Sequence, residues 1–139
     1  MTENTSYMLD EQIGYLLRRV NQRHLSIFSA SIPGVTAMQF AALARLAELG
    51  PLSQNQLGRE TSMDAATIKG VVDRLVRHGL VVAFPDPEDR RRLTLTLSDS
   101  GRSLFEATAA TALEVSERTL APLSARERSR LVALLSQLT

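Results

Sequence analysis

Small, hydrogen-bonding and cationic side chains suited to contacts with nucleic acid are concentrated in two stretches of this 139-residue sequence. The first lies within residues 64–78 and contains Ala66, Thr67, Lys69, Gly70, Asp73, Arg74 and Arg77. The second, residues 85–92, alternates proline with acidic residues and ends in three arginines. Arginine, lysine and hydroxyl groups donate hydrogen bonds to phosphates and base edges, and small residues allow close approach. Both stretches therefore favour DNA binding.

An amphipathic helix over residues 64–78 would position the first group. Its apolar residues recur with helical spacing, at Ile68, Val71, Val72, Leu75 and Val76. The opposite face carries the small and polar residues named above, so it suits the major groove. Asp64 is a typical capping residue, and Gly79 can end the helix. On the polar face, Asp73 has two possible roles: orienting a neighbouring arginine, or accepting a hydrogen bond from a cytosine amino group.

A shorter helix is predicted over residues 53–60, just before the helix at 64–78. Ser53 and Gln56 have the spacing of a capping box, in which each side chain bonds the other residue's backbone N–H. The turn at 61–63 then completes a helix-turn-helix. Because backbone N–H groups at a helix start attract anions, we expect Ser53, Gln54 and Asn55 to contact DNA phosphates.

A hairpin is predicted to follow, with strands at 80–84 and 93–97 and a charged loop at 85–92. A charge run of this kind is commonly only a solvated loop. Its position after a helix-turn-helix favours the alternative, a wing that reaches the minor groove. We expect Arg91 to enter that groove and Asp89 to brace it, while Arg90 and Arg92, on the other side of the ribbon, contact phosphates or solvent.

The hairpin also carries a family resemblance. Residues 86–101, with the run Asp-Pro-Glu-Asp-Arg-Arg followed by Leu-Thr and a glycine, resemble the wing motif of the MarR family. Leu95 and Ser98 replace the usual Val and Thr, and residues 73–75 and 79–81 match the end of the family's recognition helix and the next strand. The resemblance implies a dimeric bacterial transcription regulator, usually a repressor released by a small ligand.

Helices are also predicted on both sides of the winged part. They span about 10–31, from Thr36 to Gly50, from Ser98 to roughly Leu120, and from Ser124 onward. The terminal helices have more apolar surface than a small winged domain needs, which predicts a homodimer. The expected fold is mainly α with a small β-hairpin wing, a winged helix-turn-helix. We expect one domain over 1–139, with dimerisation helices at 10–31 and 98–139 and a DNA-binding part at 36–97.

An effector site is predicted where the first two helices meet. Its candidate residues are Arg19, Arg23, His24, Phe28, Met38 and Phe40. They combine an apolar, partly aromatic floor with cationic and donor groups, which suits an aromatic carboxylate or a coenzyme A thioester. The alternative is ordinary core, with His24 buried in it and a solvated arginine flank. Stretches at 15–19, 54–59 and 63–70 resemble a MarR subgroup that governs the breakdown of aromatic acids.

Other functional classes are disfavoured by composition. The net charge of +1 makes no case for DNA by itself, so that interpretation rests on where the charges lie. With no cysteine, two histidines and no catalytic or metal-binding motif, the sequence predicts no enzyme, metal or cofactor. No signal peptide or apolar span is present, which predicts a cytoplasmic protein without membrane contact. The remaining alternative is a winged-helix protein-interaction module that does not bind DNA.

Overall fold

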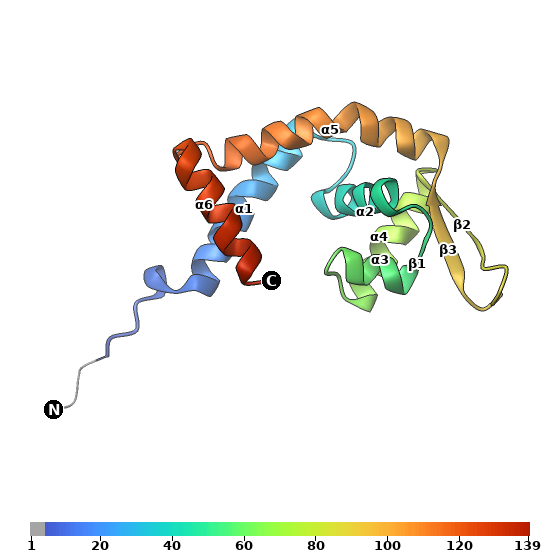
Figure 1. Ribbon diagram of the computed structural model, residues 1–139, viewed down its shortest axis with the longest axis horizontal. Helices are drawn as coiled ribbons and strands as arrows, with labels where there is room; N and C mark the ends of the chain where they lie inside the picture. The colour runs from blue at the N-terminus through green and yellow to red at the C-terminus, as the bar shows by residue number, and fades with distance from the viewer. Residues whose placement is uncertain (1–4) are drawn as a thin grey trace.

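The computed structural model describes residues 5–139, so the first four residues of the predicted domain lie outside the described part. Its elements in chain order are η1 (Leu9–Glu11), α1 (Ile13–Ser31), α2 (Ala37–Leu49), β1 (Leu52–Ser53), α3 (Gln54–Glu60), α4 (Ala65–Arg77), β2 (Val81–Pro85), β3 (Leu93–Leu97), α5 (Asp99–Thr119) and α6 (Ala125–Gln137). The long α5 joins two parts: a winged-helix body, and an arm made of α1, α6 and the end of α5 (Figure 1). The predicted mainly helical winged fold is confirmed.

Capping side chains begin the helices where the sequence predicted. Reciprocal capping boxes join Thr36 to Gln39, Ser53 to Gln56 and Ser124 to Glu127. α4 and α5 use single caps: Asp64 accepts from the Thr67 N–H at 2.7 Å, and Ser98 accepts from the Gly101 N–H at 3.0 Å. The first helix differs, because it begins at Ile13 and not near Asp10. Gln12 has an extended backbone, which separates α1 from the short η1 turn.

The predicted hairpin of β2 and β3 is confirmed, and β1 adds a third strand that the sequence did not predict. The strand order is β1-β3-β2 and both pairings are antiparallel. Leu95 of β3 pairs with Leu52 on one side and Ala83 on the other. β1 was missed because it is two residues long and overlaps the capping residue of α3. β2 also begins one residue later than predicted, since the Leu80 N–H donates to the Leu75 carbonyl at the end of α4.

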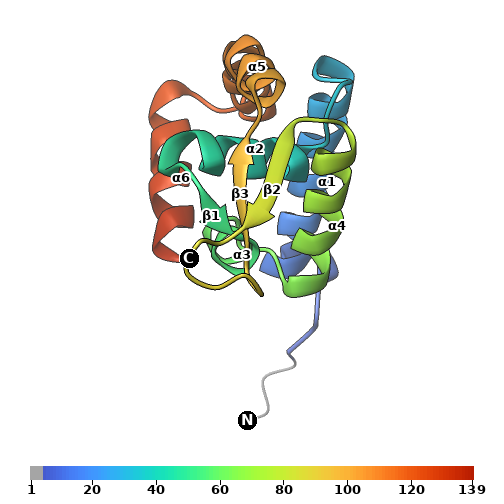
Figure 2. The same cartoon turned by 90° about the vertical axis from the view of Figure 1, so that its right-hand side faces the viewer.

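The start of α5 lies directly against the turn that follows α4. A Cβ added at Gly101 would come within 2.0 Å of the Leu80 carbonyl oxygen, so no larger residue fits without moving the backbone. The same carbonyl accepts from the Ser98 N–H at 3.1 Å, and the Ser98 hydroxyl donates to the Gly79 carbonyl at 2.6 Å. These contacts attach α5 to the sheet that carries the wing (Figure 2).

The body and the arm differ in burial. The core lies mostly within the body and includes Leu43, Leu46, Leu57, Ile68, Leu75 and Leu95, each exposed by 2% or less. In the arm, several apolar side chains that share the predicted stripe on α1 are exposed, namely Ile13, Leu16, Leu17 and Val20. On α6, Leu134, Leu135 and Leu138 are exposed as well. These apolar side chains of α1 and α6 therefore remain uncovered in a single copy of the chain.

Two further residues predicted to be buried are exposed. Val76, assigned to the apolar stripe of α4, is 40% exposed, and Met38 is 52% exposed. Val76 lies in the last turn of α4, beyond the part of the helix that packs on the core. Met38 lies in the first turn of α2, where the adjacent Gln39 is the buried residue. Both residues fit the helical spacing of apolar residues, but neither packs fully against the core.

Candidate nucleic-acid interface

The exposed face of α4 carries the predicted polar side chains. Lys69, Asp73 and Arg74 are exposed, while Ile68, Val71, Val72 and Leu75 on the opposite face are buried. Gly70 has open space where a Cβ would stand, so the fold itself does not require glycine there. That openness is compatible with its predicted part in close approach to DNA, which stays a prediction.

Asp73 is paired with a lysine and not with a neighbouring arginine. Its Oδ2 lies 2.8 Å from Lys69 Nζ, and the two residues are one helical turn apart. In the free protein the i,i+4 spacing on α4 thus gives the carboxylate a lysine partner, and the two roles expected for Asp73 on DNA stay predictions. The pair lies on the surface, with 66% of the lysine and 49% of the aspartate side chain exposed. DNA can therefore reach both charges.

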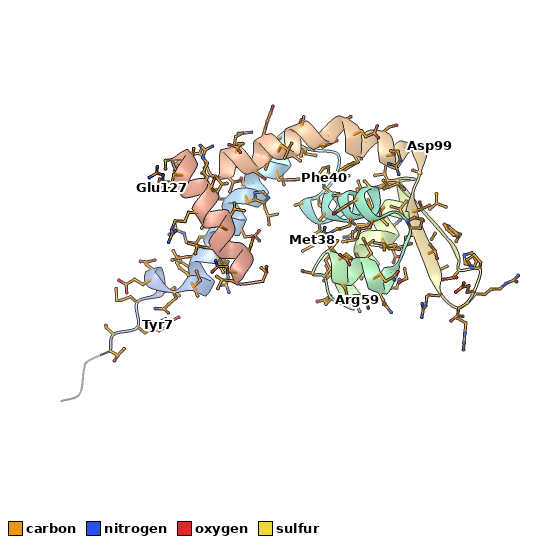
Figure 3. The ribbon with its side chains drawn as sticks, in the orientation of Figure 1. Tyr7, Met38, Phe40, Arg59, Asp99 and Glu127 are labelled. Carbon is orange, nitrogen blue, oxygen red and sulfur yellow. The ribbon has the colours of Figure 1, made fainter. Side chains whose placement is uncertain are left out.

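The helix-turn-helix and the wing meet at a cavity of about 360 Å³. It is lined by Ser53, Gln54, Asn55, Gln56, Arg59, Arg91, Arg92 and Leu93. The fold thus brings the three predicted phosphate-contacting residues at the start of α3 next to Arg91 of the wing. Two more cations line the cavity, Arg59 and Arg92, and Arg59 lies on the lower edge of the body (Figure 3). This polar, cationic hollow has the chemistry to hold a phosphate.

Arg59 was not among the predicted DNA-binding residues. It lies one turn after Asn55 on the same helix, and that i,i+4 spacing was the available signal. Arg90 was predicted but does not line this cavity. It is exposed on the wing, in agreement with the expected contact with phosphates or solvent.

The wing loop is ordered by hydrogen bonds to its own backbone. The Asp86 N–H donates to the Arg92 carbonyl at 2.8 Å, and the Asp86 carboxylate accepts from the Glu88 N–H at 2.8 Å. Asp89 Oδ1 accepts from the backbone N–H of Arg91 at 3.1 Å and from its Nε at 3.4 Å. The expected contact between Asp89 and Arg91 is therefore present, and the carboxylate holds backbone and side chain together.

The capping carboxylate of α4 has a perturbed acidity. The backbone N–H of Thr67, and then its side chain, donate to Asp64 and lower the pKa of its carboxyl below the usual value. The charged form is favoured because it accepts these bonds, and the positive end of the helix dipole adds to the effect. The start of the helix is thus most stable when Asp64 is ionised.

Two predicted effector residues instead join α1 to the end of α5. Arg23 donates from Nη2 to the Arg118 carbonyl at 3.0 Å and from Nε to the Thr119 carbonyl at 3.3 Å. His24 Nδ1 lies 2.9 Å from the Thr119 hydroxyl, which itself donates to the Val115 carbonyl. The Thr119 hydroxyl thus lies between His24 of α1 and the Val115 carbonyl of α5. Arg23 therefore adds a second donor to the Arg118 carbonyl, which also accepts from the Ala121 N–H at 3.2 Å, and bonds the Thr119 carbonyl at the end of α5.

The other four candidates do not form one cluster. The tilted rings of Phe28 and Phe40 pack with their centroids 6.0 Å apart, and Phe105 of α5, which sequence reasoning missed, extends this aromatic group at 5.4 Å from Phe40. Arg19 lies over the Tyr15 ring at 5.8 Å. Exposed Met38 is on the side of α2 away from α5, whereas Phe40 faces α5 (Figure 3). Met38 therefore does not line the same floor as the two phenylalanines.

Five cavities on the body and its linkers, of about 220–410 Å³, are lined by residues other than Arg19, Arg23, His24, Phe28, Met38 and Phe40. In one copy of the chain, Arg23 and His24 lie in the joint between α1 and α5, and Phe28 and Phe40 lie in a group of aromatic rings. Across residues 5–139, no group of three or more histidine, aspartate or glutamate side chains could hold a metal ion.

Comparison with known proteins identifies the architecture. The MarR family pattern matches residues 34–92. The transcriptional repressor NicR of Pseudomonas putida is 41% identical over 138 residues, covering 98% of this chain and 87% of the relative. The chain belongs to the MarR family. It is accordingly a regulator of transcription and not an enzyme.

Two solved structures extend the likeness to the whole fold. A probable transcriptional regulator from Pseudomonas aeruginosa superposes with a TM-score of 0.91 at 52% identity, covering 95% of this chain and 100% of that one. BpsR of Bordetella bronchiseptica, whose DNA binding is regulated by 6-hydroxynicotinic acid, also has a TM-score of 0.91, at 38% identity, covering 96% and 97%. In both cases the superposed part of the chain includes the arm as well as the winged body. None of the helices within residues 5–139 is both long and apolar enough to cross a membrane.

Proposed function

We propose that this MarR-family protein is a cytoplasmic homodimeric repressor that an aromatic carboxylate releases from a pseudo-palindromic operator. The observation that carries the DNA-binding part is the cationic cavity between α3 and the wing, beside the exposed polar face of α4. Ser53, Gln54, Asn55 and Arg59 would contact phosphates, and Thr67, Lys69 and Arg74 would work in the major groove. Ala66 and Gly70 would contribute by being small.

The dimer follows from the arm. Exposed apolar residues on α1 and α6 would be covered by the same helices of a second copy, which removes that surface from water. The two α4 helices would then reach successive major grooves, about 34–36 Å apart. Light scattering at micromolar concentration should give the mass of a dimer.

We assign the effector class from chemistry and from the relatives. NicR is a repressor at 41% identity, and BpsR responds to a hydroxylated pyridine carboxylic acid. In this chain the carboxylate of such a ligand would compete with the Arg118 and Thr119 carbonyls for the donors of Arg23, and with the Thr119 hydroxyl for His24. A charged acceptor makes the stronger hydrogen bond. Binding would therefore loosen the α1–α5 joint and change the spacing of the recognition helices.

The test measures DNA release in a mobility shift with fragments containing the promoter of the chain's own gene. We expect 6-hydroxynicotinate to release the DNA, with an aromatic acyl coenzyme A thioester as the alternative effector. Arg23→Ala and His24→Ala should each require more than about tenfold more ligand, because each loses a donor to the carboxylate. Arg102→Ala, an exposed arginine of α5 with no ion pair in the described chain, is the matched control.

Two outcomes would contradict the proposal. If both joint variants respond at the parent's ligand concentration, the effector binds elsewhere. If the parent shifts no DNA fragment at low salt, the winged body serves the alternative role of a protein-interaction module.

A further inference from the structure

Arg128 is a cation placed where the electrostatics of its own helix do not favour one. It is the fourth residue of α6, close to the positive end of the helix dipole. Its side chain is nevertheless largely covered, with 29% exposed, whereas the cations of the other ion pairs within residues 5–139 are 43–93% exposed. Contacts outside α6 must therefore account for its position.

All three nitrogen atoms of the guanidinium contact the segment that precedes α6. Nε donates to the Leu123 carbonyl at 3.0 Å, and Nη2 donates to the Ala121 carbonyl at 3.3 Å. Nη1 lies 2.6 Å from Glu117 Oε2, which adds an ion pair with α5. A planar, rigid guanidinium can bind three acceptors at once only in a narrow range of orientations. These contacts therefore fix the direction in which α6 leaves the turn after α5.

The end of α5 is thus bound by arginines from two other helices. Arg23 of α1 donates to two carbonyls in the last turn of α5, and Arg128 of α6 donates to two carbonyls just beyond it. α1 and α6 themselves lie on opposite sides of the view below α5 (Figure 2). The end of α5 is therefore the point that sets how these two helices of the arm are placed relative to each other.

α6 has little else to hold it in place within one copy of the chain. It packs closely on none of the other elements of the described part, and its exposed apolar side chains are Val132, Leu134, Leu135 and Leu138. Among residues 6–139, Arg128 is the one side chain of α6 that forms a hydrogen bond or ion pair with a residue before Ser124. The direction of α6 is therefore set at its first turn by Arg128 and not by a core.

We propose that Arg128 is a positioning residue for the homodimer, holding α6 at the angle at which its apolar side chains meet the second copy. A surface that is already in place loses less freedom on association than one that must first be ordered. Without the three contacts of Arg128, α6 would have to be ordered during association, so the dimer would dissociate more readily. This inference rests on the homodimer proposed above and is independent of the effector.

The test compares the dissociation constant of the dimer in Arg128→Ala and Arg126→Ala, by analytical ultracentrifugation of the full chain. Arg126 lies in the same turn, is exposed and forms no hydrogen bond or ion pair within residues 6–139. Both changes remove a cation from the start of α6, so the effect on the helix dipole is matched. Arg128→Ala should raise the dissociation constant by about tenfold or more, and Arg126→Ala should leave it within about twofold of the parent.

Arg128→Lys separates the geometry of the guanidinium from its charge. Lysine keeps the cation for an ion pair with Glu117, but a single ammonium cannot bind both carbonyls and the carboxylate in the same arrangement. The dissociation constant of this variant should therefore stay at least about fivefold above that of the parent. If lysine restores the parent's value, charge alone is sufficient and the positioning role is overturned.

Amide hydrogen exchange distinguishes a misplaced α6 from a misfolded chain. In Arg128→Ala, α6 should exchange faster than in the parent, while α3, α4 and β3 keep the parent's protection.

Three outcomes would overturn the inference on its own, with the parent still a dimer. They are an unchanged dissociation constant in Arg128→Ala, an equal loss in Arg126→Ala, and a loss of protection in the winged body as large as that in α6. A monomeric parent would instead overturn the homodimer, and the positioning role with it.

Discussion

The recognition helix α4 and the wing each present one cation beside one carboxylate, but they hold these pairs in different ways. On α4, Lys69 and Asp73 are one turn apart and lie 2.8 Å from each other. In the wing, Arg91 and Asp89 are two residues apart in a loop, at 3.4 Å. The helix pair is placed by a backbone whose other face is buried, whereas the wing pair is placed only by local hydrogen bonds.

This difference indicates what each acid contributes. α4 would direct Lys69 outward even without Asp73, because four buried residues hold the helix against the core. The Arg91 side chain is 93% exposed and loses more freedom when it binds. Asp89 also accepts from the Arg91 N–H, so it orders the loop itself. We therefore expect Asp73 to act mainly through its charge and Asp89 mainly through its geometry.

The largest effect is expected from the wing arginine. Arg91→Ala should weaken operator binding by about tenfold or more, because it removes the side chain expected in the narrow, electronegative minor groove. Arg92→Ala is the matched control and should cost clearly less, since it is expected to meet only phosphate or solvent. Fluorescence anisotropy at fixed salt measures both. Equal losses would show that the two arginines act alike, as a simple basic tip.

Removing the two acids should have opposite effects on binding to DNA of unrelated sequence. Asp73→Ala frees Lys69 and removes a negative charge near phosphates, so that binding should tighten severalfold. Asp89→Ala also removes a negative charge but disorders Arg91, so that binding should weaken.

The salt dependence of the same measurements separates charge from geometry. Lys69→Ala serves as the reference variant. If Lys69 holds a phosphate, this change should lower the slope of log affinity against log salt concentration by about 0.9. Tighter binding by Asp89→Ala would contradict its bracing role. An unchanged slope would remove Lys69 from the phosphate contacts.

The smallest effect concerns the start of α4 at acid pH. Hydrogen bonds from Thr67 lower the pKa of Asp64, so its cap stabilises the helix fully above the unfolded pKa, about 3.9. That contribution is lost as the pH falls through the lower, folded pKa. Amide exchange at Thr67 should therefore become faster only in this acid range. Asp64→Asn, which caps without titrating, should remove that step; a step that persists would have to come from another acid.

Much of the body was predictable because its signals are local. Capping boxes at Thr36 and Ser53, the stripe of α4 and the spacing of Asp89 and Arg91 all depend on residues within one or two turns. Hydrogen bonds and burial at such short range follow from the order of the residues. For that reason the winged helix and most of its polar face could be predicted from sequence.

Contacts between distant segments were decided only by the tertiary structure. Arg23 meets the carbonyls of Arg118 and Thr119 across 95 and 96 residues, and no sequence period connects them. Gly101 is required by the Leu80 carbonyl, and Gln39 lines a cavity built from three elements. The sequence determined which helices form and which faces are polar. Packing decided which of those faces meet, because a helical period specifies a direction and not a partner.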